Sequence, residues 1–133
     1  MKRLLLLFIS LLICSIVYSE ELMEKKEELK EQIVKNFNEK NIDTDLIIEY
    51  AKLFLPEKFH YDDDKLRTPY FSEDFYSWMI WFTLKDEYIT EDLYKDGVAI
   101  WGYEVSVRKL TGEARITGFV EKSEGIYDED PYK

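Results

Sequence analysis

Few residues in this chain could carry out catalytic chemistry. Its 133 residues include one histidine, His60, and one cysteine, Cys14. General acid–base catalysis usually needs a histidine or a tuned carboxylate held against a partner group. No nucleophile motif such as G-x-S-x-G accompanies His60, and the sequence has no Gly-rich phosphate loop, no H-E-x-x-H and no C-x-x-C. We therefore expect no catalytic residues and no enzyme activity, with His60 an ordinary surface imidazole.

An acidic run, Asp62-Asp63-Asp64, follows His60 and could offer oxygen ligands to Ca²⁺. The run lacks the spaced acids, the central glycine and the closing glutamate of an EF-hand loop. We expect a solvated acidic loop here, with no bound metal and no cofactor.

Aromatic residues in a strand pattern are the better candidates for binding, because exposed rings stack on sugars or anchor protein partners. Residues 75–85 alternate between two faces. One face is wholly apolar, with Tyr76, Trp78, Ile80, Phe82 and Leu84. The other carries Phe75, Ser77, Met79, Trp81 and Thr83. If helices cover the apolar face, Met79, Trp81 and Thr83 line an open surface; burial of Trp81 under a long loop is the alternative. Trp101 and Tyr103 in the next strand are further binding candidates.

Two helices are expected before these strands. Leu22, Leu29, Ile33 and Phe37 recur at helical spacing and predict a helix over residues 20–38. A second helix over residues 45–55 follows a cap at Asp43 or Thr44 and ends before Pro56, since proline cannot continue a helix.

The second half of the chain predicts three strands, over residues 75–85, 98–108 and 113–121. Residues 109–112 form a tight hairpin in which Gly112 supplies a positive φ. Residues 57–74 form a long loop that signals either function or a missed short element, and residues 86–97 form a polar flap. The fold class is therefore α+β, with two N-terminal helices packed on a three- to four-stranded antiparallel meander sheet.

The N-terminus has the layout of a secretory signal peptide. Met1-Lys2-Arg3 is basic, Leu4 to Val17 is nearly all apolar, and Ser19 precedes an abrupt change to charged residues. We expect cleavage after Ser19 and export to the periplasm or outside the cell. Lipidation at Cys14 and retention as an uncleaved anchor are the alternatives. The domains are then a signal peptide over 1–19, one α+β domain over 20–121 and a polar, disordered tail over 122–133.

Charge excludes one class of partner. The formal net charge is −10, and cleavage would change it to −12 by removing Lys2 and Arg3. Nucleic acids and anionic membrane surfaces bind proteins that neutralise phosphate with Lys and Arg, so we expect neither as a partner. Hydrophobic residues at 46% and aromatic residues at 16% indicate a folded domain rather than an acidic disordered tail.

The segment Tyr103 to Glu113, YEVSVRKLTGE, resembles the closing hairpin of PepSY-type domains, and the helix before Pro56 is similar to the helix before the PepSY sheet. The resemblance covers residues 44–121, with Arg108 where the family usually has Asp. It implies an exported, non-catalytic module that contacts a peptidase or another envelope protein. The same hairpin also resembles NTF2-like immunity-type proteins, which implies a pocket for a toxin or small ligand.

Together these features predict an exported, non-enzymatic protein-binding module. Its expected contact surface lies around Met79, Trp81 and Thr83. One alternative is a pocket protein or small pocket enzyme built from Trp101, Tyr103 and acids on the sheet. Another is a purely structural envelope protein that forms oligomers through the helix over residues 20–38.

Overall fold

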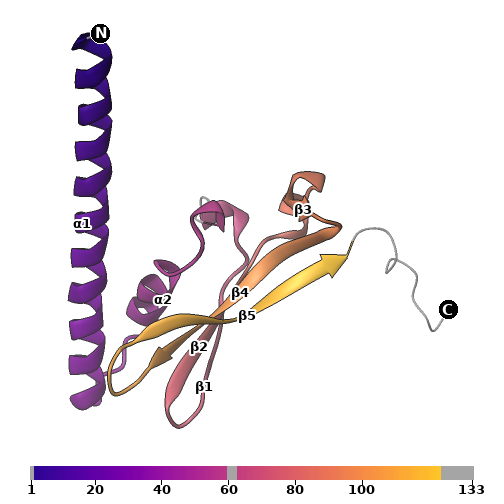
Figure 1. Cartoon of the computed structure of the whole chain (residues 1–133). Helices are drawn as coiled ribbons and strands as arrows, with labels where there is room; N and C mark the ends of the chain where they lie inside the picture. Colours follow the sequence, from indigo (N-terminus) through magenta and orange to yellow (C-terminus); the bar gives the residue numbers. More distant parts are fainter. Residues whose placement is uncertain (1, 60–62, 124–133) are drawn as a thin grey trace, which may run out of the picture.

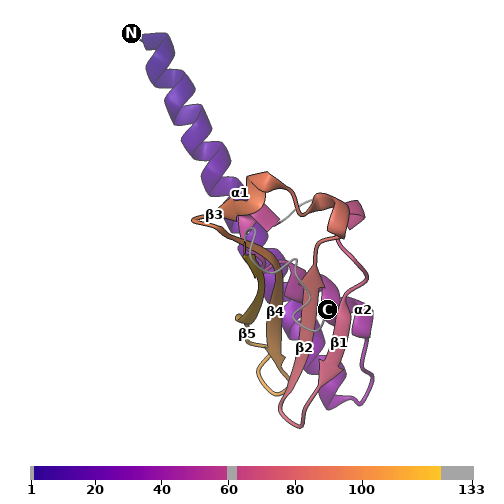
Figure 2. The same ribbon diagram turned by 90° about the vertical axis from the view of Figure 1, so that its right-hand side faces the viewer.

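An antiparallel sheet with two helices on one side forms the body of the protein (Figures 1 and 2). The computed structural model describes residues 2–59 and 63–123. The helices are α1 (Lys2–Asn38) and α2 (Thr44–Lys52); the strands are β1 (Tyr70–Glu73), β2 (Ser77–Thr83), β3 (Tyr94–Lys95), β4 (Val98–Arg108) and β5 (Ala114–Ser123). β4 pairs with β2 and β5, β1 pairs with β2, and β3 pairs with the first residues of β4, all antiparallel. The predicted α+β class, with two helices packed on an antiparallel sheet, is confirmed.

The core lies between the sheet and the helices. Alternate residues of β2, Trp78, Ile80 and Phe82, are fully buried, because their face of the strand meets α1 and α2. Their neighbours in the core are Val105 and Val107 from β4, Ile33 from α1, and Ile47, Tyr50 and Ala51 from α2. We call this side of the sheet the helix-covered face and the other side the open face.

α2 follows the sequence pattern closely. The Asp43 carboxylate accepts a hydrogen bond from the Leu46 backbone N–H at 3.2 Å, which makes Asp43 the N-cap. The helix ends at Lys52, three residues before the predicted end, and Leu53 is its C-cap.

α1 is longer than the predicted helix, because it also includes residues 2–19 without a break. Its C-terminal part packs on the core through Leu29, Ile33 and Phe37. Its N-terminal part projects away from the body (Figure 1). Within the described residues, no helix has the combination of length and apolarity needed to cross a bilayer. Cleavage after Ser19 stays a prediction.

Two segments predicted as irregular contain short strands. Residues 57–74 hold β1 as well as two 3₁₀ turns, Glu57–Phe59 and Asp63–Lys65. Residues 86–97 hold β3 and the 3₁₀ turns Asp86–Tyr88 and Glu91–Leu93. Among residues 2–59 and 63–123 the sheet therefore has five strands, one more than the upper limit expected. At the other end, Lys122 and Ser123 belong to β5, so the predicted tail boundary was too early. Residues 124–133 lie outside the described part of the chain.

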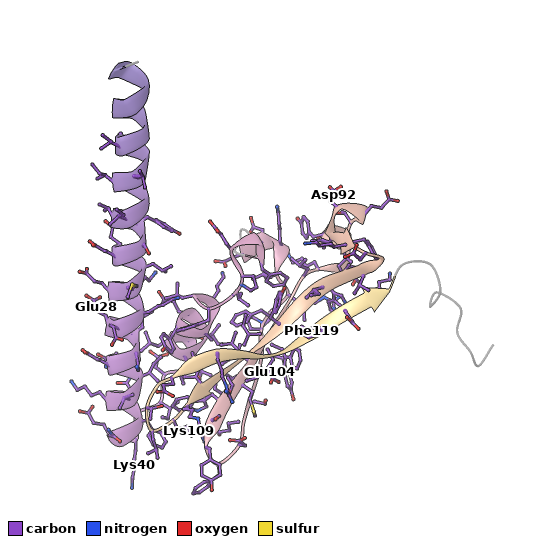
Figure 3. All side chains as sticks on the ribbon, viewed as in Figure 1. Glu28, Lys40, Asp92, Glu104, Lys109 and Phe119 are labelled. Carbon is purple, nitrogen blue, oxygen red and sulfur yellow. The ribbon has the colours of Figure 1, made fainter. Side chains whose placement is uncertain are left out.

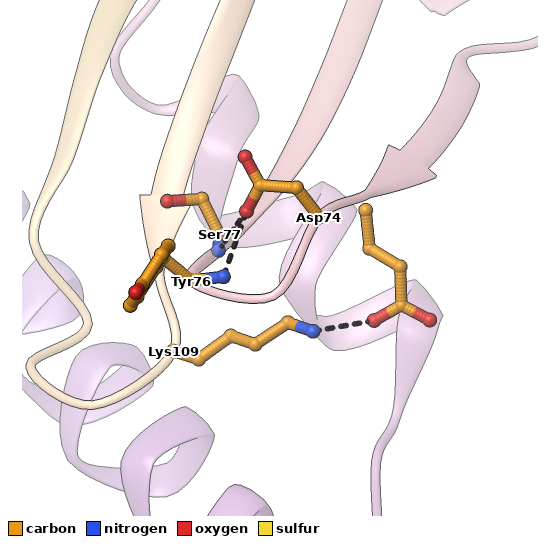
Figure 4. Close-up of polar contacts among 5 residues, drawn as sticks. Asp74, Tyr76, Ser77 and Lys109 are labelled. Atoms are coloured by element: carbon orange, nitrogen blue, oxygen red, sulfur yellow. Dashed lines mark hydrogen bonds and ion pairs between the residues drawn. The ribbon is translucent and has the colours of Figure 1, made fainter.

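The start of β2 also differs from the prediction. Asp74 accepts hydrogen bonds from the backbone N–H groups of Tyr76 and Ser77, at 2.8 and 2.7 Å, and this closes the turn between β1 and β2 (Figure 4). Phe75 and Tyr76 therefore lie in the turn, 84% and 69% exposed. The prediction that Tyr76 belongs to the apolar buried face was wrong.

The hairpin between β4 and β5 docks on the helices through Gly112. This residue has φ +72°, as predicted, and its N–H donates to the Arg108 carbonyl at 2.8 Å. Its own carbonyl accepts a 2.7 Å hydrogen bond from the buried Tyr50 hydroxyl of α2. A Cβ at this position would lie 2.8 Å from Lys30 Cγ of α1. Only glycine fits both the conformation and the space.

Candidate functional site

The five predicted binding residues divide between the two faces of the sheet. Directly opposed residues in an antiparallel pair share a face. Trp101 and Tyr103 pack against the buried core, so they belong to the helix-covered face. Met79, Trp81 and Thr83 alternate with the buried residues of β2 and are each half-buried on the open face. The five residues therefore do not form one site.

Trp81 lies at the centre of the open face. Its partners in the register are Tyr70 on β1 and Glu104 on β4, and Glu104 is opposite Gly118 on β5. A Cβ built on Gly118 would lie 3.2 Å from Trp81 Cη2 and 3.7 Å from Cζ2. The six-membered ring of the indole therefore extends across β4 and rests over the backbone of β5. Gly118 provides the space because it has no side chain.

A second glycine extends the apolar part of this face. A Cβ on Gly102 of β4 would lie 2.8 Å from Thr83 Cγ2 and 3.3 Å from Val120 Cγ2. The two methyl groups thus lie close over the bare backbone of β4. Together with the neighbouring Trp81 and Met79, they form an apolar strip across three strands, which we call the Trp81 strip.

The polar groups beside the Trp81 strip are of two kinds. The Thr117 hydroxyl donates a 2.7 Å hydrogen bond to Glu104 Oε1, which holds that carboxylate (labelled in Figure 3) against β5. Arg108 is opposite Ser77, and Arg115 is opposite Ser106, which is itself opposite Met79, so both arginines belong to the open face. The ion pairs of the described residues include neither arginine. This end of the open face therefore carries two guanidinium groups, with Glu113 opposite Arg108 as the neighbouring carboxylate.

Trp101 and Tyr103 have different surroundings. The Arg67 guanidinium lies 5.7 Å from the centroid of the Trp101 ring and is paired with Asp86. Tyr103 meets Phe59 edge to face, with centroids 5.0 Å apart. Tyr103 and Phe59 also line a hollow of about 410 Å³ beside the segment that carries β3, together with Pro56, Asp92, Leu93, Lys95, Asp96, Val98 and Ile100. Trp101 does not line this hollow.

The other titratable groups give no reactive arrangement in the described part of the chain. Burial, together with the smaller effects of the nearby Glu27 and Glu113 carboxylates, raises the pKa of Tyr50 to about 12. The Tyr50 hydroxyl is engaged with Gly112, so its role is structural. Residues 2–59 and 63–123 contain no cluster of three or more His, Cys, Asp or Glu side chains placed to hold a metal. Asp63 forms an ion pair with Lys52; His60 and Asp62 lie outside the described residues.

Several residues of the open face were not among the predicted ones. Tyr70, 67% exposed beside Trp81, was missed because β1 was not expected. Glu104, Arg115 and Val120 lie on strands that were expected, but the sequence does not say which residues are opposite Trp81. Gly118 did carry a signal, since an isolated glycine within a strand often marks close approach of another group.

Comparisons with known proteins add no relative to this geometry: no protein-family model, curated protein or solved structure matches the chain. The PepSY-like and NTF2-like resemblances stay predictions from the sequence.

Proposed function

We propose that this chain is an exported, non-enzymatic module that binds another protein through the open face of its sheet. The observation that carries the proposal is the position of Trp81, whose indole rests on Gly118 on the face of the sheet opposite α1 and α2. A large apolar ring on the solvent side of a sheet contributes little to a core. Tryptophan and arginine are the residues that most often dominate the free energy of protein–protein binding.

The chemistry of the face indicates what kind of segment would bind. The Trp81 strip offers an apolar surface, and Arg108 and Arg115 offer two guanidinium groups at one end of it. A protein segment with an apolar anchor side chain and neighbouring carboxylates complements this arrangement. The net charge of −10 disfavours a nucleic acid or an anionic membrane as the partner.

Export is the second part of the proposal. It is supported by the basic start, the apolar run from Leu4 to Val17 and the small residue Ser19. An exported chain meets its partner in the envelope or outside the cell. On the PepSY resemblance, that partner is a peptidase or another envelope protein.

Cross-linking in the native envelope, with mass spectrometry of the captured protein, tests the proposal. The Trp81→Ala variant should lower the affinity for the partner by at least about thirtyfold, as expected for a dominant contact. Phe75→Ala is the matched control, because Phe75 is an exposed aromatic residue in the β1–β2 turn. Arg115→Glu should also weaken capture if the segment is acidic. Capture that survives Trp81→Ala in a folded protein would rule out this face.

A second function is favoured by one observation, the hollow of about 410 Å³ lined by Phe59 and Tyr103. It suits a small, partly apolar ligand, as in the pocket alternative. Native mass spectrometry of protein purified from cells would detect such a ligand. Loss of the bound mass in Tyr103→Ala, with Trp81→Ala unaffected, would select this function over the first.

A further inference from the structure

β5 forms a long edge of the sheet. Within the described residues its ten residues pair with β4 only, so the outer side of the strand has unpaired backbone groups. Two large apolar residues on it, Ile116 and Phe119, are 40% and 58% exposed. Figure 3 shows Phe119 on this strand, toward the end that is far from α1. Long edges of this kind tend to pair with another strand unless something prevents it.

The backbone groups that point outward can be identified. The Glu113 carbonyl accepts a 2.9 Å hydrogen bond from the Arg108 N–H, so Glu113 points toward β4. Successive residues of a strand alternate in this direction, so Ala114 and Ile116 point away from β4. In a strand, residues whose side chains lie on one face also direct their backbone N–H and C=O groups to the same edge. Phe119, opposite Tyr103 on the helix-covered face, therefore also points outward.

A bulge in β5 makes this edge self-complementary. The register with β4 passes from Ile116 to Gly118, which leaves Thr117 as the extra residue. Thr117 bonds to Glu104 on the open face, and Gly118 lies under Trp81 on the same face. Ile116 and Phe119 consequently share a side although they are three residues apart.

Two copies of β5 could pair antiparallel around the bulge in several registers. Only one of these registers places both residues of every opposed pair on the same face of the sheet. It places Ile116 opposite Phe119 of the second copy, and Thr117 opposite Gly118. A slip of one residue would set Ile116 opposite Val120, which belongs to the open face. A slip of this kind moves side chains to the wrong face of the sheet. In many proteins a bulge at a sheet edge hinders pairing. In β5 the bulge instead restricts pairing to a single register.

We propose that β5 pairs with β5 of a second copy of this chain in that register, about a two-fold axis perpendicular to the sheet. The partner is a second copy because the strand complements itself. In the symmetric dimer the contact between Ile116 of one copy and Phe119 of the other occurs twice, once on each side of the axis. The backbone groups of both residues point outward and can pair. The same register brings Glu113 opposite Lys122 of the second copy, a pair of opposite charge.

The dimer would join the two open faces on one side of a continuous sheet. The axis passes beside Gly118, so the two Trp81 rings would flank the seam. A partner protein with two copies of its own binding segment would then gain avidity. This consequence rests on the proposed function, whereas the strand pairing does not.

Mixed-cysteine cross-linking tests the register. Cys14→Ser is the background, and Ile116→Cys and Phe119→Cys are made in separate full-length chains. In the proposed dimer these two positions are opposed, with Cα atoms about 5.5 Å apart, within the range of a disulfide. Identical positions in the two copies are offset by three residues, or roughly 10 Å. Oxidation should therefore link the mixed sample and neither sample alone. No link in the mixture, or equal links in all three, would overturn the register.

Sedimentation velocity tests the dimer itself. The parent chain should sediment as a dimer, and Phe119→Lys should shift it to a monomer, because a lysine would replace the ring at each contact. Phe75→Lys is the matched control and should stay dimeric. A monomeric parent chain at high concentration, or a dimer unaffected by Phe119→Lys, would refute the pairing. Trp81→Ala should remain dimeric, and Phe119→Lys should still capture the partner through single copies. The two proposals can therefore fail independently.

Discussion

The two faces of the sheet in this protein have different surroundings, and the two tryptophans of β2 show the difference most clearly. Trp78 points to the helix-covered face, is 2% exposed, and meets Phe37 of α1 edge to face. Trp81, three residues later, lies on the open face and rests on a glycine of β5. The first ring is enclosed by helices, while the second is supported from below by strands alone. Because the sheet covers only one side of the Trp81 ring, the other side can contact a partner.

The faces also differ in how their polar groups are used. On the helix-covered face the Tyr50 hydroxyl bonds to the Gly112 carbonyl and joins α2 to the β4–β5 hairpin. On the open face Thr117 bonds to Glu104 within the sheet, and Arg108 and Arg115 form no ion pair in the described part. Polar groups on the helix-covered face therefore join the helices to the sheet. On the open face the two arginines remain available to a partner.

The largest expected effect is at Trp78. Trp78→Ala removes a fully buried ring and leaves a cavity, which should lower the free energy of unfolding by about 3–5 kcal/mol. Trp81→Ala should cost less than half of that, because the indole is only partly removed from water in the folded state. Denaturant unfolding of both variants measures the difference. Equal losses would mean that Trp81 is part of the core and that the comparison of faces fails.

A smaller effect is expected at Tyr50. Tyr50→Phe removes the hydrogen bond to the buried Gly112 carbonyl and should cost about 1–3 kcal/mol at neutral pH. The pKa of Tyr50 rises from 10.0 in the unfolded chain to about 12 in the fold, so folding favours the neutral phenol. This contribution is complete below pH 10 and is lost as the pH rises through 12.

Unfolding free energies of the parent chain and of Tyr50→Phe, measured from pH 8 to pH 12, check both statements. The difference between the two proteins should shrink above pH 10, and subtraction removes the effect of the other tyrosines. A constant difference across this range would show that folding does not change the pKa of Tyr50.

The layers of the fold were predictable because they follow from simple periodicities. Helical spacing identified the part of α1 that packs and the whole of α2, and alternation identified β2, β4 and β5. β1 was missed because it has four residues, directly after Pro69, and no alternation to separate it from loop. β3 has two residues and exists only through its pairing with β4. Short strands of this kind are defined by their neighbours.

The candidate site was predictable only in part. Alternation separates Met79, Trp81 and Thr83 from Trp78 within one strand. It does not relate one strand to the next, because the long connection from β2 to β4 leaves their register open. Trp101 and Tyr103 were therefore grouped with Trp81 as candidates although they lie on the other face. The position of the indole over Gly118 depends on two registers, that of β2 with β4 and that of β4 with β5.

The smallest expected change in stability is also the sharpest probe of the open face. Gly118→Ala would place a Cβ 3.2 Å from Trp81 Cη2, so the indole must move by a few tenths of an ångström. Alanine also reduces the freedom of the unfolded chain, which is worth roughly 0.5–1 kcal/mol in favour of folding. The two effects oppose each other, and the free energy of unfolding should change by less than about 1 kcal/mol. The Trp81 indole N–H resonance should nevertheless shift while that of Trp78 stays in place, and the affinity for the partner should fall. An unchanged Trp81 resonance would mean that the ring does not rest on Gly118.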